Sequence, residues 1–184
     1  MKAFVTGGTG FVGGMLVRKL CEAGYQVRAL VRPGADTPQL TGLPVERVQG
    51  DLRDFDSLVK GAVGCQLVFH VAALYSFWGY SDEDFYQVNV IGTRNTLEAA
   101  RKAGAERVIY TSSIATLAFH EDRSPVDESE PSSLEDMITP YKRTKYLAED
   151  VAREYAAAGL PLVILNPSSP VGVGDHKPTA TGQV

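Results

Sequence analysis

Short runs of apolar residues alternate with longer amphipathic stretches along most of this chain. The runs are rich in β-branched residues and only five or six residues long, which suits buried strands better than helices. We predict strands over residues 2–6, 26–31, 45–49, 66–71, 107–111 and 161–165. Because helix-forming stretches separate most of these runs, the strands should lie parallel and be joined by crossover helices.

The amphipathic stretches carry apolar residues at helical spacing. The first of them is followed by Gly24, in the position of a C-terminal cap. We predict helices over residues 11–23, 55–62, 82–103 and 141–158. Residues 119–138 and 167–184 are interrupted by Pro, Gly and polar residues and should be loops. The expected fold class is α/β: a Rossmann-type, doubly wound parallel sheet in a three-layer αβα arrangement.

Composition and charge exclude several classes of protein. Apolar residues make up 44% of the 184 residues and charged residues 22%, as in ordinary globular proteins, so a disordered or fibrous chain is excluded. The net charge is −4 and basic residues form no run, so no nucleic acid partner is expected. Cys21 and Cys65 have neither zinc-site nor disulfide-framework spacing, so no metal is expected. We expect a cytoplasmic protein without a membrane span, because no apolar stretch approaches roughly 18 residues.

The segment TGGTGFVG, residues 6–13, lies where the first predicted strand passes into the first helix. Gly7, Gly10 and Gly13 permit a tight turn, a close approach of the backbone to a pyrophosphate, and close packing of helix on strand. The following helix would add N–H groups and the positive end of its dipole. A glycine-rich turn without a ligand is the alternative, but the strand before and the helix after favour a dinucleotide site.

The end of the second predicted strand bears on the choice of coenzyme. NAD enzymes commonly place an acid there for the ribose 2′-hydroxyl, whereas this chain has Arg32. A guanidinium can pair with a 2′-phosphate, so NADP is favoured and NAD remains the alternative. Arg32 could also be merely solvated at a strand end. Asp51, after the third strand, is placed to accept from the adenine amino group or to cap the next turn.

Tyr141 and Lys145 form a candidate acid–base pair. Thr139 and Pro140 precede them as a plausible N-cap and first helical residue, so the pair should lie one turn apart on one helix face. A free phenol has a pKa near 10, and an adjacent ammonium and a positively charged nicotinamide would lower it toward neutrality. Proton transfer by Tyr141 would then become feasible.

Ser112 and Ser113 follow the fifth predicted strand, at the edge where open α/β sheets bind ligands. A hydroxyl there can donate to a substrate carbonyl oxygen as charge develops on it. The alternative is a hydroxyl that only caps the end of the strand. The glycine-rich turn, the serines and the Tyr-Lys pair support one another through their order along the chain.

Seven motifs give the chain a specific resemblance to a known family. They are TGGTGFVG (6–13), GDL (50–52), HVAA (70–73), NVIGTRN (89–95), YTSSIAT (110–116), YKRTK (141–145) and NPSSPVG (166–172). Together they resemble the extended short-chain dehydrogenase/reductase superfamily, also described as the NAD-dependent epimerase/dehydratase family. Within it, the chain is most similar to the dihydroflavonol-4-reductase-like branch and to hopanoid-associated sugar epimerases.

The resemblance implies roles for individual residues. Ser113 would polarise the substrate carbonyl, Tyr141 would donate or accept the proton, and Lys145 would hold the nicotinamide ribose and lower the pKa of the tyrosine. Asn89 would support the backbone of the active site. The residues expected to bind the coenzyme are Gly7, Thr9, Gly10, Phe11, Val12, Gly13, Arg32, Asp51, Leu52, Val71, Ala72, Ala73, Tyr141, Lys145, Pro167 and Ser168. His70 is interpreted as structural, since other residues supply the acid and base.

The expected function is that of an NAD(P)-dependent oxidoreductase, which reduces a carbonyl or oxidises a secondary alcohol by hydride transfer. One alternative is a nucleotide-sugar epimerase or dehydratase without net redox, and another is a non-catalytic dinucleotide-binding protein. Residues 1–166 should form the NAD(P)-binding domain and 167–184 the start of a loop on the substrate side. Family members usually continue further, so most of a substrate domain should be absent from this chain. The sequence is compatible with a homodimer but does not decide the oligomeric state.

Overall fold

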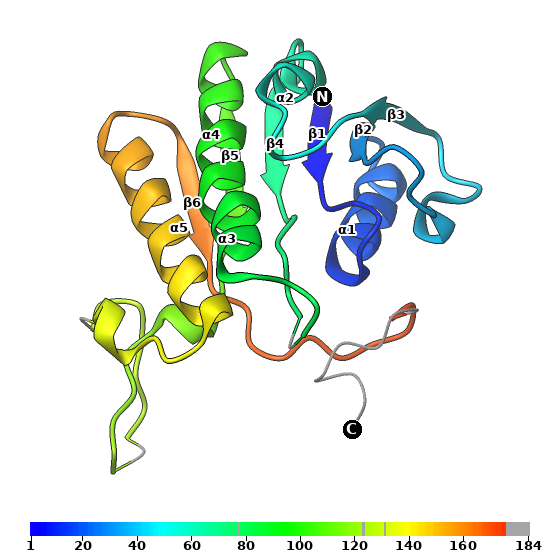
Figure 1. Ribbon diagram of the computed structural model, residues 1–184. Helices are drawn as coiled ribbons and strands as arrows, with labels where there is room; N and C mark the ends of the chain where they lie inside the picture. The colour runs from blue at the N-terminus through cyan, green and yellow to red at the C-terminus, as the bar shows by residue number, and fades with distance from the viewer. Residues whose placement is uncertain (77, 123, 131, 176–184) are drawn as a thin grey trace.

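The apolar runs predicted as strands form one parallel sheet in the computed structural model, which describes residues 1–76, 78–122, 124–130 and 132–175. The six strands are β1 (Lys2–Thr6), β2 (Gln26–Val31), β3 (Val45–Gln49), β4 (Leu67–His70), β5 (Arg107–Thr111) and β6 (Leu162–Leu165). Their order is β3-β2-β1-β4-β5-β6, and every neighbouring pair is parallel (Figure 1). The order reverses between β1 and β4, where such sheets bind ligands at the carboxyl ends of their strands.

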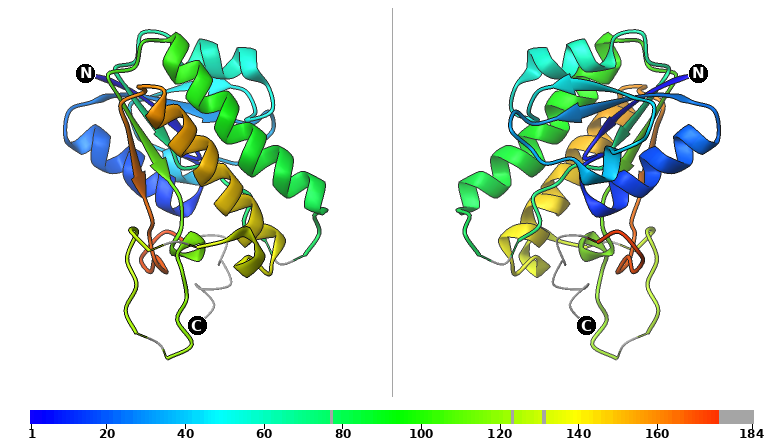
Figure 2. Two further views of the ribbon diagram at one scale, coloured as in Figure 1. Left: turned by 90° about the vertical axis from the view of Figure 1, so that its left-hand side faces the viewer. Right: turned by 90° about the vertical axis from the view of Figure 1, so that its right-hand side faces the viewer.

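Helices cover both faces of the sheet. Helix α1 (Phe11–Glu22) packs on one face, and α2 (Phe55–Ala62), α4 (Gly92–Lys102) and α5 (Pro140–Ala157) pack on the other (Figures 1 and 2). The expected Rossmann-type α/β fold with three αβα layers is confirmed. Both the strands and the long helices begin and end within a residue or two of their predicted positions, with the exception of residues 82–103.

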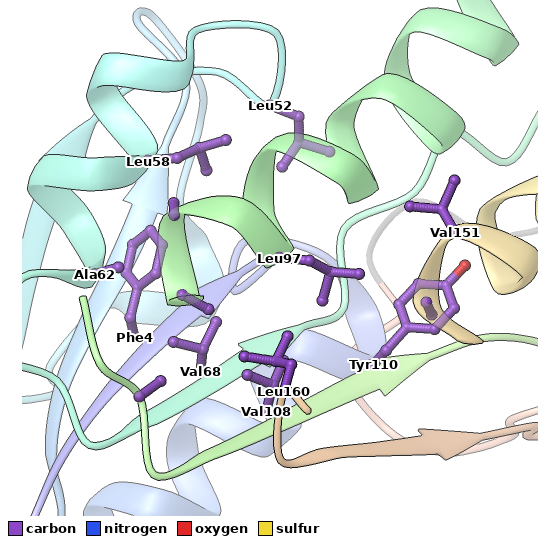
Figure 3. Close-up of a cluster of buried hydrophobic side chains, with 14 of the residues drawn as sticks. Phe4, Leu52, Leu58, Ala62, Val68, Leu97, Val108, Tyr110, Val151 and Leu160 are labelled. Carbon is purple, nitrogen blue, oxygen red and sulfur yellow. The ribbon is translucent and has the colours of Figure 1, made fainter. Parts of the chain in front are cut away.

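Two hydrophobic cores meet at β1, because successive side chains of a strand point to opposite faces. Phe4 points toward α2 and packs with Leu58 in the larger core (Figure 3). Ala3 and Val5 point the other way and pack with Val17 of α1 in the smaller core. The uninterrupted apolar run of β1 is therefore explained by burial from both sides.

Residues 82–103, predicted as one helix, form three consecutive helical pieces: α3 (Asp82–Phe85), the π-helical segment η2 (Tyr86–Ile91) and α4. Within this run, Asn89 is buried and its carbonyl accepts a hydrogen bond from Thr93 Oγ1 at 2.6 Å. A π turn widens the helix by one residue per turn and re-aims the side chains inside it. The predicted helix is present as one uninterrupted helical run, and its π-helical middle was not predicted, because apolar spacing does not register the change of turn.

Short 3-10 helices occur within segments that were predicted as loops or left unassigned. They are η1 (Pro38–Leu40), η3 (Ile114–Thr116) and η4 (Leu134–Asp136). Residue 166, the predicted end of the coenzyme domain, directly follows β6. Residues 176–184 of the predicted final loop lie outside the described residues, and the division into domains stays a prediction.

Strand β6 is the outermost strand on its side of the described sheet. Leu162 and Ile164 pack against the larger core, on the face that α5 covers. Val163 and Leu165 point the other way and are 37% and 49% exposed. Only one face of this strand is therefore well covered in the described residues.

Helix α5 begins as predicted, with Thr139 as its N-cap and Pro140 as its first residue. The Thr139 hydroxyl accepts a hydrogen bond from the backbone N–H of Lys142 at 3.2 Å. We expect Thr139→Ala to lower the free energy of unfolding by about 1 kcal/mol in urea titrations. Thr37→Ala is a matched control, because Thr37 precedes η1 without a side-chain cap, and should change stability by less than about 0.5 kcal/mol. Equal losses for the two variants would contradict the expectation.

Candidate active site

The glycine-rich turn joins β1 to α1 at the carboxyl edge of the sheet. Gly7 has a φ of 76°, a conformation that favours glycine, and a Cβ there would come within 2.5 Å of the backbone nitrogen of Ala72. A Cβ on Gly13 would overlap the carbonyl of Gly7. Gly10 donates its N–H to that carbonyl at 3.0 Å and closes the turn. Two of the three predicted glycines are thus required by close backbone packing.

The N-terminus of α1 is suited to hold a phosphate. Gly10 is its N-cap, no side chain caps the first turn, and no acid lies in that turn. Unpaired N–H groups and the positive end of the helix dipole therefore face the carboxyl edge of the sheet. The turn has room for a ligand only because its residues are glycines, and the helix next to it has free N–H groups. Both features fit the pyrophosphate of a dinucleotide.

Segments distant in sequence meet around this turn. Residues 71–73, which are expected near the coenzyme ribose, lie next to the glycine-rich turn. Ala72 donates its N–H to Thr6 Oγ1 at 3.4 Å. After β6 the chain crosses beneath the sheet toward α1 (Figure 1), and a Cβ on Gly172 would lie 3.5 Å from the ring of Phe11. Pro167 accepts a hydrogen bond from the N–H of Ile114 at 3.1 Å, next to Ser113. Pro167 and Ser168 are exposed.

A surface cavity of about 430 Å³ lies beyond the ends of β2 and β3. It is lined by Arg32, Pro33, Gly34, Ala35, Asp51 and Arg53. The Asp51 carboxylate accepts from the N–H and Nε of Arg53 at 3.0 and 2.8 Å, and from its Nη2 at 3.1 Å. These hydrogen bonds hold the pKa of Asp51 below its usual range. The turn-capping role considered for Asp51 is thus present, and Arg32 faces the same cavity.

Sequence reasoning missed Arg53, which also lines this cavity, and the place of Leu52 beside the adenine stays a prediction. Arg53 stands two residues after Asp51, the spacing of an Asx turn, and this was the available signal. Leu52, expected to flank the adenine, has its side chain in the larger core beneath α4. Its carbonyl accepts from Asn95 Nδ2 at 3.0 Å. The side chain and the backbone carbonyl of Leu52 therefore both face α4.

Tyr141 is the second residue of α5, and this helix packs against η3, which Ser113 precedes as its N-cap. Burial raises the pKa of Tyr141 and outweighs the opposite effect of the nearby Ser113 side chain, with a smaller contribution from Tyr75. The ring of Tyr75 meets that of Tyr141 edge-on, with centroids 4.8 Å apart. The expected lowering of the tyrosine pKa by Lys145 and a bound nicotinamide stays a prediction, and desolvation of the phenol is the largest influence in this structure.

Lys145 is buried on the same helix face, at 2% exposure. Its Nζ donates to the carbonyl of Thr111 at 2.8 Å and to the hydroxyl of Tyr110 at 3.1 Å. Burial lowers the pKa of Lys145 to about 7, against the opposing charge of Glu149. This amine can therefore gain or lose a proton near neutral pH.

The two serines after β5 have different surroundings. Ser112 is buried and donates to Glu149 Oε2 at 2.5 Å, away from Tyr141. Ser113 caps η3 by accepting from the N–H of Ala115 at 3.1 Å, and its side chain is near enough to Tyr141 to lower the pKa of the phenol in part. Of the two serines, Ser113 is the one beside the candidate acid.

Asn89 and His70 support the site from below. Asn89 exchanges hydrogen bonds with the backbone of Leu74 at 2.7 and 3.1 Å, as the resemblance implies, and donates to Thr144 Oγ1 at 3.0 Å. His70 is buried, with Nδ1 2.7 Å from Thr6 Oγ1 and Nε2 2.9 Å from a threonine of α4. Burial, with a smaller contribution from the charge of Lys145, lowers the pKa of His70 to about 3. A neutral, fully bonded imidazole fits its interpretation as structural.

Two further searches concern only the described part of the chain. None of its helices combines the length and apolar character needed to cross a bilayer. Its His, Cys, Asp and Glu side chains form no group of three or more that could hold a metal ion.

Comparisons with known proteins match the chain throughout. The family model for the NAD dependent epimerase/dehydratase family matches residues 3–184. The "Putative dihydroflavonol 4-reductase" of Synechocystis sp. is 52% identical over 181 residues, which cover 98% of this chain and 52% of that protein. The crystal structure of gox2253 matches with a TM-score of 0.92 and 45% identity, covering 100% of this chain and 56% of that one.

A second solved structure adds a bound coenzyme. It is a short-chain dehydrogenase/reductase superfamily protein from Agrobacterium tumefaciens with bound NAD, with a TM-score of 0.78 and 32% identity, covering 94% of this chain and 50% of that one. The chain spans about half the length of the curated relatives it matches. With a family model matched over almost every residue, the chain belongs to the NAD dependent epimerase/dehydratase family.

Proposed function

We propose that this chain carries the coenzyme-binding and proton-transfer half of an NADP-preferring reductase that acts on a ketone or aldehyde. The packing of η3, which Ser113 caps, against α5, which carries Tyr141 and the buried Lys145, supports this proposal. Ser113 follows β5 at the carboxyl edge of the sheet, the edge where α1 begins with an uncapped N-terminus. The reductase name of the Synechocystis relative supports the reaction class.

The roles of the side chains follow from their surroundings. When bound, the nicotinamide would supply the hydride to the carbonyl carbon. Tyr141 would donate its proton to the carbonyl oxygen, and Ser113 would stabilise that oxygen by donating a hydrogen bond. Lys145 would hold the nicotinamide ribose. Burial raises the pKa of Tyr141, which fits a phenol that carries a proton to donate.

Titration of the full-length protein with NADPH and NADH tests the proposal at its first step. We expect NADPH to bind more tightly, followed by a fall in nicotinamide absorbance on addition of a suitable ketone or aldehyde. Turnover on a panel of carbonyl compounds then measures the reaction. If the full-length protein bound neither NADPH nor NADH, the proposal would be wrong.

A nucleotide-sugar epimerase or dehydratase is the second candidate, favoured by the description of the family. In that chemistry the hydride leaves and returns within one cycle. Such an enzyme would retain its nicotinamide through gel filtration and show no net absorbance change during turnover. A reductase must exchange its coenzyme in every cycle, so this experiment distinguishes a reductase from an epimerase or dehydratase.

Arg32 is proposed to give the preference for NADP by pairing with the 2′-phosphate. It lines the cavity beyond β2, where an NAD enzyme would commonly place an acid. We expect Arg32→Ala to weaken NADPH binding by about tenfold and to leave NADH binding within about twofold, measured by nicotinamide fluorescence. Arg18→Ala, an exposed arginine on α1, is the control and should change neither affinity. Equal losses for both coenzymes would contradict the assignment.

A further inference from the structure

One oxygen of Glu149 accepts hydrogen bonds from three parts of the chain. Its Oε2 receives Ser112 Oγ at 2.5 Å, Thr116 Oγ1 at 2.8 Å and Asn166 Nδ2 at 2.8 Å. These donors come from the end of β5, from η3 and from the residue after β6. Glu149 is only 4% exposed, so its carboxylate replaces water with these three donors.

Two of these groups also lie next to the Ser113 carbonyl. Thr116 Oγ1 lies 2.8 Å and Asn166 Nδ2 3.1 Å from it, and the single hydroxyl proton of Thr116 can go either to this carbonyl or to Glu149. Ser112 and Thr116 stand on either side of Ser113 in the chain. The turn that presents the Ser113 hydroxyl to Tyr141 is therefore fastened to α5 through the Glu149 carboxylate.

Glu149 belongs to a row of side chains spaced by four residues on α5. Tyr141, Lys145, Glu149 and Arg153 follow one another at this spacing, which places them on one helix face. Arg153 Nη2 lies 2.6 Å from Glu149 Oε1, so the second oxygen is paired at the outer end of the row. The charge of Glu149 also favours the ammonium form of Lys145.

We propose that Glu149 is a positioning residue for the reaction, whose carboxylate sets the Ser113 turn against the Tyr141–Lys145 face of α5. This inference rests on the proposed function, because it assumes that Ser113 and Tyr141 act on one carbonyl oxygen. A glutamate that only stabilised the fold would affect unfolding and not the chemical step. Misplacing a hydrogen-bond donor by about 1 Å can lower a rate by about 100-fold.

Glu149→Gln in the full-length protein tests the proposal. The glutamine has no charge, and with its oxygen toward the three donors its NH2 group would face the Arg153 guanidinium, so the carboxylate's two-sided anchoring is lost. We expect kcat to fall by about tenfold to 100-fold, with KM and coenzyme affinity within about threefold. Glu154→Gln is the control on the same helix, since Glu154 is exposed and pairs with Arg94, and should keep kcat within about twofold. An unchanged kcat in Glu149→Gln, or an equal loss in the control, would overturn the proposal.

A second variant covers the case in which Glu149→Gln does not fold. Ser112→Ala removes one donor to the carboxylate and leaves its charge and its other two donors in place. We expect kcat to fall by about threefold to tenfold at unchanged coenzyme affinity. A kcat equal to that of the wild type would overturn the positioning role. Wild-type protein that binds coenzyme but reduces no carbonyl would instead overturn the proposed function and this inference with it.

Discussion

Replacing Tyr141 by Phe should lower kcat by about 1000-fold, because the variant keeps the ring and loses the proposed acid. The ring can still pack against Tyr75, so coenzyme affinity should stay within about twofold. Steady-state rates followed at the nicotinamide absorbance, with affinities from fluorescence titration, measure both quantities. The raised pKa of Tyr141 predicts that the wild-type phenol remains a proton donor throughout the neutral range.

Tyr155→Phe is the matched control for this prediction. Tyr155 lies on the same helix, and its hydroxyl is 3.4 Å from Glu98 on α4, away from the carboxyl edge of the sheet. Its loss should leave kcat within about twofold. If Tyr141→Phe retained the wild-type rate, the acid would have to be another group, and the non-catalytic dinucleotide-binding alternative would gain support.

Gly13→Ala should abolish measurable coenzyme binding and lower the free energy of unfolding by about 1–3 kcal/mol. The added methyl group would overlap the carbonyl of Gly7, so α1 would have to move away from the turn. Alanine normally stabilises a helix interior by up to about 1 kcal/mol relative to glycine, so the expected sign is the reverse of the usual one. Urea unfolding and NADPH titration of the full-length variant measure the two effects.

Gly24→Ala separates the coenzyme turn from a general effect of glycine replacement near α1. Gly24 follows the other end of the helix at a φ of 80°, and a Cβ there meets no atom within 4 Å. We expect a stability loss of about 1 kcal/mol and unchanged NADPH affinity. Normal coenzyme binding by Gly13→Ala would show that the close packing of α1 on the turn is not needed for the site.

Much of the fold could be predicted because each strand is a short apolar run bounded by turn residues. β1, β2, β3 and β5 have the predicted bounds. The π-helical segment η2 could not be predicted, since the apolar spacing of the sequence does not change across it. Tertiary contacts of single polar groups leave no periodic trace in a sequence.

The positions of the candidate site residues could be predicted from the sequence better than their pKa values. Ser113 follows β5, and Tyr141 and Lys145 lie one turn apart on α5, as predicted, while their joint role in one site stays a prediction. The pKa of Tyr141 was expected to fall next to an ammonium and a bound nicotinamide, and the structure adds the desolvation of a buried phenol. Glu149 escaped notice because an acid on an amphipathic helix usually faces solvent, although its spacing from Lys145 placed it on the same face.

The exposed side of β6 has a practical consequence for work with the described residues alone. Val163 and Leu165 present apolar side chains on a strand whose outer edge carries unpaired backbone groups in the described sheet. An open, apolar strand edge is a template on which other chains can add and aggregate. Preparations that end shortly after this strand should therefore be checked for fibril formation, and a lysine in place of Val163 would be a suitable safeguard.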